Sequence, residues 1–128
     1  MKYLLDTHVL LWWVAGDPRI SREAREVIAD SGSELYFSAA SSWEIAIKVG
    51  LGRLKLPKPP RVWLPRILRE QAIIPLEITH AHALQVAELP GHHRDPFDRI
   101  LAAQAKIERL VMISSDRLIP RYGLDMLW

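Results

Sequence analysis

MKYLLDTHVLLWW, residues 1–13, places a short apolar segment directly before an acid. Residues 3–5 predict a first buried strand, and the apolar spacing from Val9 onward predicts a helix immediately after it. Asp6 and His8 interrupt the apolar run and no small-residue cleavage site follows, so we do not expect a signal peptide. This stretch favours an α/β fold with a carboxylate where its first strand ends.

The rest of the chain repeats this alternation of short apolar segments and helical patterns. Further strands are predicted at 34–38, 73–74 and 110–113, with an edge strand at 124–128. Helices are predicted at 22–30, 41–50, 62–71, 80–87 and 96–109. Because parallel neighbours need a helical crossover, the alternation predicts a parallel sheet covered by helices on both faces.

The composition fits one domain, and we expect residues 1–128 to form it. With 49% apolar residues the chain can bury a core, and the absence of cysteine excludes disulfides and thiolate metal sites. No stretch approaches the roughly 18 uncharged apolar residues of a membrane span. We therefore expect a cytoplasmic protein without a membrane partner. A net charge of +2 does not establish nucleic-acid binding, although 12 of the 17 basic residues are arginine, which suits phosphate.

Acidic residues recur close to the ends of the predicted strands. Asp6 directly follows the first strand, Glu44 lies in the helix after the second, and Asp116 comes shortly after the fourth. Asp95 and Asp98 open the helix that precedes the fourth strand. Ligand sites of open parallel sheets lie beyond the carboxyl ends of the strands, so we expect these acids to share one rim.

Several of these acids also have purely structural explanations. Ser41 and Glu44 have the spacing of a capping box, with Ser41 as the N-cap. Asp95 before Pro96 is a favourable N-cap, and Asp98 then lies in the first turn, where the helix dipole stabilises an acid. Considered one at a time, each of these residues could therefore be either a helix cap or a catalytic residue.

Asp6 is harder to explain by capping alone. A carboxylate that ends a buried strand has lost solvation and needs a cation or several donors to remain charged. Carboxylates gathered at one rim repel one another, and a hard divalent cation such as Mg²⁺ relieves that repulsion. Such a cation can orient water, lower its pKa and neutralise charge on a phosphodiester. The set therefore predicts metal-assisted hydrolysis without a serine or cysteine nucleophile.

Four segments resemble the PIN-domain toxins of the VapC type in their order and spacing: LLDTH at 4–8, SSWEIAIK at 41–48, HRDPFDRILAAQA at 93–105 and SSD at 114–116. The resemblance implies a twisted, mostly parallel sheet flanked by helices in three α/β/α layers. It also implies an Mg²⁺- or Mn²⁺-dependent endoribonuclease, the toxin of a type II toxin–antitoxin system. Its partners would be the RNA substrate, a cognate antitoxin and a second copy in a homodimer.

The resemblance carries roles to individual residues. Asp6, Glu44, Asp98 and Asp116 match the catalytic acids of the family. Asp6 and Asp98 are the expected direct metal ligands, whereas Glu44 and Asp116 are expected to hold water of the cation's shell or to complete the acidic pocket. Ser114 matches a small hydroxyl residue two positions before the fourth acid, where threonine is frequent.

Further residues have two possible roles each. Thr7 is expected to cap the first helix, to bond an active-site carboxylate, or both. Arg99 is expected either to contact substrate phosphate or to form a surface ion pair. Asp95 belongs to the HRDPFDR version of the motif, but capping alone explains it. His8 and His93 are candidates for contact with phosphate, and a zinc site at the adjacent histidines 92–93 is disfavoured because neighbouring side chains point apart.

Three other functions fit parts of the pattern. A catalytically inactive PIN-like module that binds RNA or a protein would keep the same fold, although phosphate binding needs no bare carboxylates. A phosphorylated receiver-like domain is disfavoured because Asp6 stands alone and no lysine follows Lys106. Cleavage of DNA instead of RNA stays open, since nothing in the sequence reads a 2′-hydroxyl.

Overall fold

Strands and helices alternate along the chain, as the sequence predicted. The computed structural model describes residues 1–128. The strands are β1 (Lys2–Leu5), β2 (Glu34–Ser38), β3 (Ile73–Leu76), β4 (Val111–Ile113) and β5 (Met126–Leu127). The α-helices are α1 (Thr7–Ala15), α2 (Arg22–Ala29), α3 (Ala39–Gly50), α4 (Pro60–Glu70), α5 (His80–Gln85) and α6 (Pro96–Glu108), with 3₁₀ turns η1 (Val86–Glu88) and η2 (Ile119–Tyr122).

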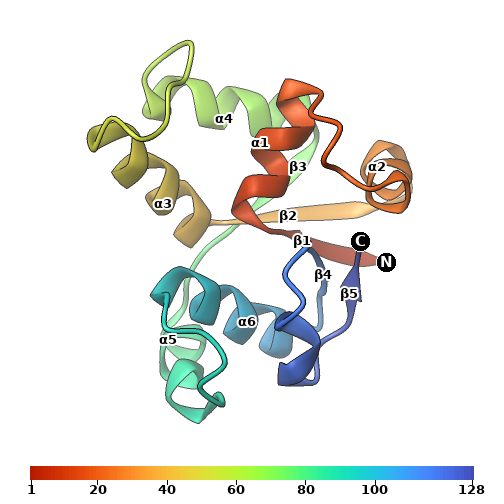
Figure 1. Ribbon diagram of the computed structural model, residues 1–128, viewed down its shortest axis with the longest axis vertical. Helices are drawn as coiled ribbons and strands as arrows, with labels where there is room; N and C mark the ends of the chain where they lie inside the picture. Colours follow the sequence, from red (N-terminus) through yellow and green to blue (C-terminus); the bar gives the residue numbers. More distant parts are fainter.

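The five strands form one sheet in the order β3-β2-β1-β4-β5, and every pairing is parallel. The central strand β1 pairs with β2 on one side, where Leu4 lies opposite Tyr36, and with β4 on the other, where Leu5 lies opposite Ile113. The predicted three-layer α/β/α arrangement is confirmed: α1, α2 and α4 cover one face of the sheet, and α5 and α6 cover the other (Figure 1).

Two apolar cores lie on opposite faces of the sheet, because successive side chains of a strand point to opposite sides. Leu5 joins the larger core with Leu10 of α1 and Leu68 of α4. Its neighbour Leu4 packs against Leu101 of α6 in the second core. Since β1 is buried on both faces, the residue that follows it is buried too.

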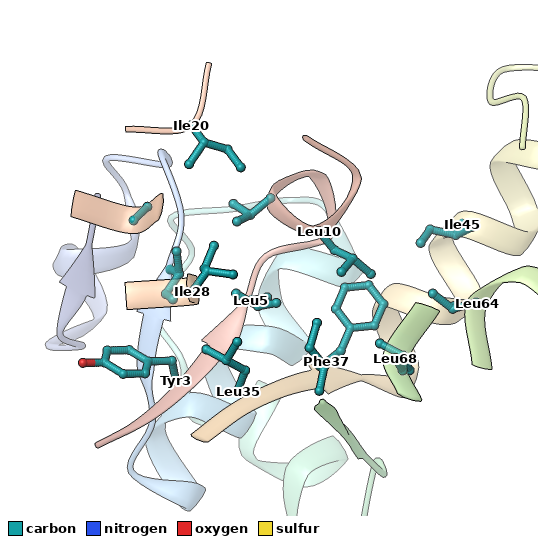
Figure 2. Packing of buried hydrophobic residues seen from close by; sticks show 14 residues of the cluster. Tyr3, Leu5, Leu10, Ile20, Ile28, Leu35, Phe37, Ile45, Leu64 and Leu68 are labelled. Carbon is teal, nitrogen blue, oxygen red and sulfur yellow. The ribbon is translucent and has the colours of Figure 1, made fainter. Parts of the chain in front are cut away.

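The larger core fills the space between the sheet and the helices on its first face. Figure 2 shows the ring of Phe37 near Leu10 and Leu68, with Leu5 and Leu35 along the sheet. Phe37 is 1% exposed, and burial of a side chain of this size contributes about 1.5–3 kcal/mol to folding. This packing holds β1 and β2 rigidly beneath α1 and places the ends of both strands at one rim.

The start of α3 differs from the prediction. The helix begins at Ala39, and Ser38, the last residue of β2, is its N-cap, with Oγ accepting from the amide of Ala40 at 3.0 Å. The predicted capping box of Ser41 and Glu44 is therefore wrong. Ser41 lies inside the helix and is fully buried, so its hydroxyl bonds another helix instead of capping its own.

Other element boundaries differ by a few residues. β3 extends to Leu76, because Pro75 occupies an edge strand where its missing amide costs no ladder bond. α4 begins two residues early at Pro60, a residue favoured in the first turn of a helix. None of the helices combines the length and the apolar character that crossing a bilayer requires.

Candidate active site

A small pocket of about 120 Å³ opens at the carboxyl ends of β1, β2 and β4. Its lining includes the four predicted catalytic acids: Asp6, Glu44, Asp98 and Asp116. Thr7, His8, Leu11 and Lys48 complete the lining. A larger groove of about 550 Å³ beside α3 and α4 contains no carboxylate.

Asp6 is both a helix cap and a member of the acidic pocket. Its carboxylate is buried, with Oδ1 accepting from the amide of Thr7 at 2.8 Å and Oδ2 accepting from the hydroxyl of Ser114 at 2.7 Å. The Nδ1 atom of His8 lies 3.7 Å from Oδ2. These donors offset the lost solvation of the carboxylate and hold it at the rim, while its remaining lone pairs are available to a ligand.

Ser114 connects the ends of two neighbouring strands. Ser114 is fully buried. Its hydroxyl oxygen accepts from the amide of Asp116 at 3.0 Å, and its hydroxyl hydrogen is donated to Asp6. Asp116 is thereby turned back toward the pocket. Its Oδ1 accepts from the amide of Leu118 at 2.9 Å, an Asx turn that leads into η2.

Asp98 has the most perturbed acid–base chemistry of the pocket. Burial raises the pKa of this carboxyl to about 6, and the negative charges of Asp95, Asp6 and Asp116 add to the rise, which His93 partly offsets. The charge of Asp98 is therefore poorly compensated by the protein itself. Carboxylates in this situation bind a cation or take up a proton near neutral pH.

Glu44 reaches the pocket from α3 and is paired with Lys48. The ion pair measures 2.9 Å between Oε2 and Nζ, one helical turn apart. Thr7 does not cap α1, because Asp6 is the N-cap, and its hydroxyl bonds no carboxylate. It donates instead to Ser41 at 2.7 Å, one turn before Glu44, and so anchors α3 to the strand end. Lys48 was not among the predicted site residues, although the four-residue spacing from Glu44 is the usual spacing of a helical ion pair.

His93 lies beside Asp98 and Asp116. The sequence offered it as a contact for phosphate but did not indicate that it bonds one of the acids. Its Nε2 is 2.6 Å from Oδ2 of Asp116, and its Nδ1 is 2.7 Å from the hydroxyl of Tyr122. His93, Asp98 and Asp116 each place one potential ligand atom within 4.8 Å of the others. Tyr122 was not singled out from the sequence, because its 3₁₀ turn carries no periodic pattern that would indicate what it faces.

Two of the predicted pocket residues, Arg99 and Asp95, are not among the residues that line the pocket. Arg99 does not line the pocket and forms no surface ion pair: its guanidinium donates to the backbone carbonyls of Val86, Leu89 and Pro90 at 2.8–3.3 Å. Arg99 thereby ties α6 to η1 and to the loop that follows it. Asp95 is exposed and caps α6, with Oδ1 accepting from the amide of Phe97 at 2.8 Å.

Comparison with known proteins shows the family to which the chain belongs. Residues 3–124 match the PIN-domain family. Ribonuclease VapC22 of Mycobacterium tuberculosis is 33% identical over 117 residues, which cover 89% of this chain and 86% of that protein. Ribonuclease VapC16 of the same organism is 38% identical over 69 residues, which span 51% of this chain and only about half, 49%, of the relative.

Solved structures share the fold at low identity. VapBC2 from Rickettsia felis, crystallised with a DNA fragment from its promoter, aligns with a TM-score of 0.73 at 16% identity, covering 99% of this chain and 98% of that one. FitAcB from Neisseria gonorrhoeae aligns with a TM-score of 0.66 at 21% identity, covering 100% and 97%. The match to the PIN-domain family over residues 3–124 and the 33% identity to VapC22 over 89% of the chain show that the chain belongs to the PIN-domain family and is of the VapC type.

Proposed function

We propose that this chain, acting as a single domain over residues 1–128, is a divalent-metal-dependent endoribonuclease and the toxin of a type II toxin–antitoxin pair. The observation that carries the proposal is the convergence of Asp6, Glu44, Asp98 and Asp116 on one small pocket. The ribonuclease names of its relatives VapC22 and VapC16 support RNA as the substrate.

The donor set of the pocket fits Mg²⁺ or Mn²⁺. Its candidate ligands are carboxylate oxygens, the donors that these hard cations prefer, and the chain has no cysteine to favour a softer metal. The raised pKa of Asp98 fits as well, because a cation would compensate the charge that its neighbours leave unbalanced. We propose Asp6 and Asp98 as the direct ligands.

When bound, the metal would supply Lewis-acid stabilisation of the phosphodiester and lower the pKa of water. The residues of the chain supply positioning. Glu44 pairs with Lys48 through Oε2, so its Oε1 is available to accept the proton of an attacking water. Lys48 and the half-exposed His8 face the pocket, where they would hold phosphate groups of the RNA.

A cleavage assay tests the proposal directly. The wild-type chain should cut end-labelled RNA with Mg²⁺ or Mn²⁺ and lose that activity in EDTA. Loss of a residue that hydrogen-bonds a metal ligand lowers the metal affinity or activity of an enzyme by about 10–100-fold. Asp6→Asn removes a proposed ligand itself, so it should reduce the rate of cleavage at least about 100-fold. Asp125→Asn is the matched control, because Asp125 is exposed and precedes β5 at the opposite end of the parallel strands.

The alternative of an inactive binding module gives different results. If the chain is such a module, the wild type and Asp98→Asn should bind RNA or a protein equally well, and neither form should cleave RNA. Full activity of Asp6→Asn, or cleavage that EDTA leaves unchanged, would refute the metal-site assignment. The VapC type also supports a cognate antitoxin and a homodimer as partners, which co-expression with the neighbouring open reading frame and light scattering would test.

A further inference from the structure

A relay of side chains leads from the interior of the protein to the acidic pocket. The rings of Tyr122 and His93 are stacked, with an interplanar angle of 9° and centroids 5.5 Å apart. The Tyr122 hydroxyl lies 3.1 Å from the backbone nitrogen of His93 and 2.7 Å from its Nδ1. On the other side of the ring, Nε2 lies 2.6 Å from Oδ2 of Asp116.

We propose that His93, held by Tyr122, is a positioning residue that donates its Nε2–H to Asp116 and is not itself a metal ligand. This inference rests on the proposed function, since it assigns a task to a residue beside the same metal site. It also decides between two arrangements that the short distances alone allow, because His93 lies near enough to Asp98 and Asp116 to share a cation with them.

The hydrogen-bonding capacity of each group determines where the hydrogens lie. An ionised carboxylate only accepts, so Nε2 at 2.6 Å from Asp116 must carry a hydrogen. The backbone amide of His93 only donates, so the Tyr122 oxygen accepts from it and can give its own hydrogen to Nδ1 of a neutral ring. In a protonated ring both nitrogens donate, and Nε2–H donates to Asp116 just as it does in the neutral ring. A ligating imidazole nitrogen must be free of hydrogen, so in both states of the metal-free protein Nε2 is committed to Asp116 and would have to lose its hydrogen to bind a cation.

The relay fixes Asp116 from both sides. His93 holds Oδ2 while the amide of Leu118 holds Oδ1 at 2.9 Å. The His93 side chain is 7% exposed, and Tyr122 is buried against Ala102 and Ala103 of α6, the helix that also carries Asp98. Asp116 is thereby tied to the same rigid element as Asp98. Hydrogen-bonded partners of this kind orient metal-site carboxylates and are needed for full metal affinity.

Nuclear magnetic resonance of the wild-type protein tests the assignment without any enzymatic readout. Long-range ¹H–¹⁵N spectra report which imidazole nitrogens carry hydrogen, and the His93 signals are identified by their absence from His93→Gln. We expect Nε2 of His93 to be protonated without metal and to remain so at saturating Mg²⁺. Loss of the Nε2 hydrogen on adding Mg²⁺ would show that His93 is a ligand and would overturn the proposal.

Variants test whether the relay matters for metal binding. By analogy with other outer-shell residues, His93→Ala should weaken Mn²⁺ binding in calorimetry by about 10-fold. His93→Gln should recover most of that loss, because its amide can donate to Asp116 in place of Nε2–H. Tyr122→Phe keeps the packed ring and should weaken binding in the same direction. His80→Gln and Tyr36→Phe are the controls, since neither side chain is near the pocket or hydrogen-bonded.

The outcomes separate this inference from the proposed function. Equal Mn²⁺ affinity for His93→Ala and wild type, or no recovery in His93→Gln, would overturn the positioning role. If circular dichroism shows that His93→Ala does not fold, the wild-type NMR spectra and the Mn²⁺ affinity of Tyr122→Phe still test the positioning role of His93. A wild-type chain that binds no divalent cation would instead overturn the proposed function, while an unprotonated Nε2 in the metal-free protein would overturn the relay alone. In cleavage assays we expect kcat to fall while KM for RNA stays unchanged.

Discussion

Oδ2 of the buried Asp6 accepts a 2.7 Å hydrogen bond from Ser114, a residue 108 positions away in the chain. The register of the sheet brings them together: Leu5 of β1 lies opposite Ile113 of β4, so the next residue of each strand meets its counterpart at the rim. The same bond ties the segment that carries Asp116 to the end of the central strand. The geometry of the acidic pocket therefore depends on the pairing of β1 with β4.

Removal of this hydroxyl should destabilise the protein. Ser114→Ala leaves Oδ2 of Asp6 and the amide of Asp116 without a donor and an acceptor, which costs about 1–3 kcal/mol for buried groups. Urea denaturation measures the loss, and Ser31→Ala at an exposed turn is the control. Ser114→Thr keeps the hydroxyl and should retain more stability than Ser114→Ala; the reverse order would show that space, not the hydrogen bond, dominates this position.

The contact between Thr7 and Ser41 should show strong energetic coupling. Thr7→Val keeps the shape but leaves the buried Ser41 hydroxyl without its 2.7 Å partner, at an expected cost of about 1–3 kcal/mol in unfolding free energy. The double variant Thr7→Val/Ser41→Ala removes both polar groups and should cost less than the sum of the single changes. Strict additivity in the double-mutant cycle would mean that this bond does not hold α3 against the strand end.

The charge on Asp98 should cost stability when no metal is bound. The pKa of Asp98 is about 6 in the folded protein against an ordinary value of 3.8, so the folded state binds more protons between these values. Stability should therefore fall as pH rises through this window and stay lowered above it. After allowance for partial solvent screening, Asp98→Asn should stabilise the metal-free protein by about 1 kcal/mol at pH 8.

Thermal unfolding in EDTA at several pH values measures this effect. The stabilisation by Asp98→Asn should shrink as pH falls below 6 and vanish below about pH 3, where the wild-type carboxyl is protonated in both the folded and the unfolded state. Added Mg²⁺ should narrow the difference at pH 8 by stabilising only the wild type. A variant that is less stable than wild type at pH 8 in EDTA would contradict the electrostatic account of the pocket.

Lys48 should contribute to RNA binding through its charge. If it holds a phosphate, Lys48→Met should raise KM for RNA and lower the slope of log KM against log salt by about 0.7, the value for one single-strand contact. Arg22→Met is the matched control, because it breaks a similar four-residue ion pair on α2, with Glu26. An unchanged salt slope in Lys48→Met would restrict Lys48 to neutralising Glu44.

Local sequence patterns predicted the elements well but not all of their starts. The N-cap residue Asp95 is where the sequence placed it, because a cap depends on side chains within three residues. Ser41 and Glu44 have the spacing of a capping box and do not form one. The start of α3 was decided by β2, whose pairing with β3 ends at Ser38 opposite Leu76 and leaves that serine to cap the helix.

The sequence by itself determined which acids end the buried strands and open the helices, since strand and helix periods place residues relative to their own element. Only the tertiary structure decided which distant groups meet them. Tyr122 bonds His93, 29 residues away, and His93 in turn bonds Asp116, while Arg99 bonds backbone carbonyls, because irregular loops bring these groups together. A loop's path follows from which polar groups it must satisfy after the core has packed, and no local period encodes that.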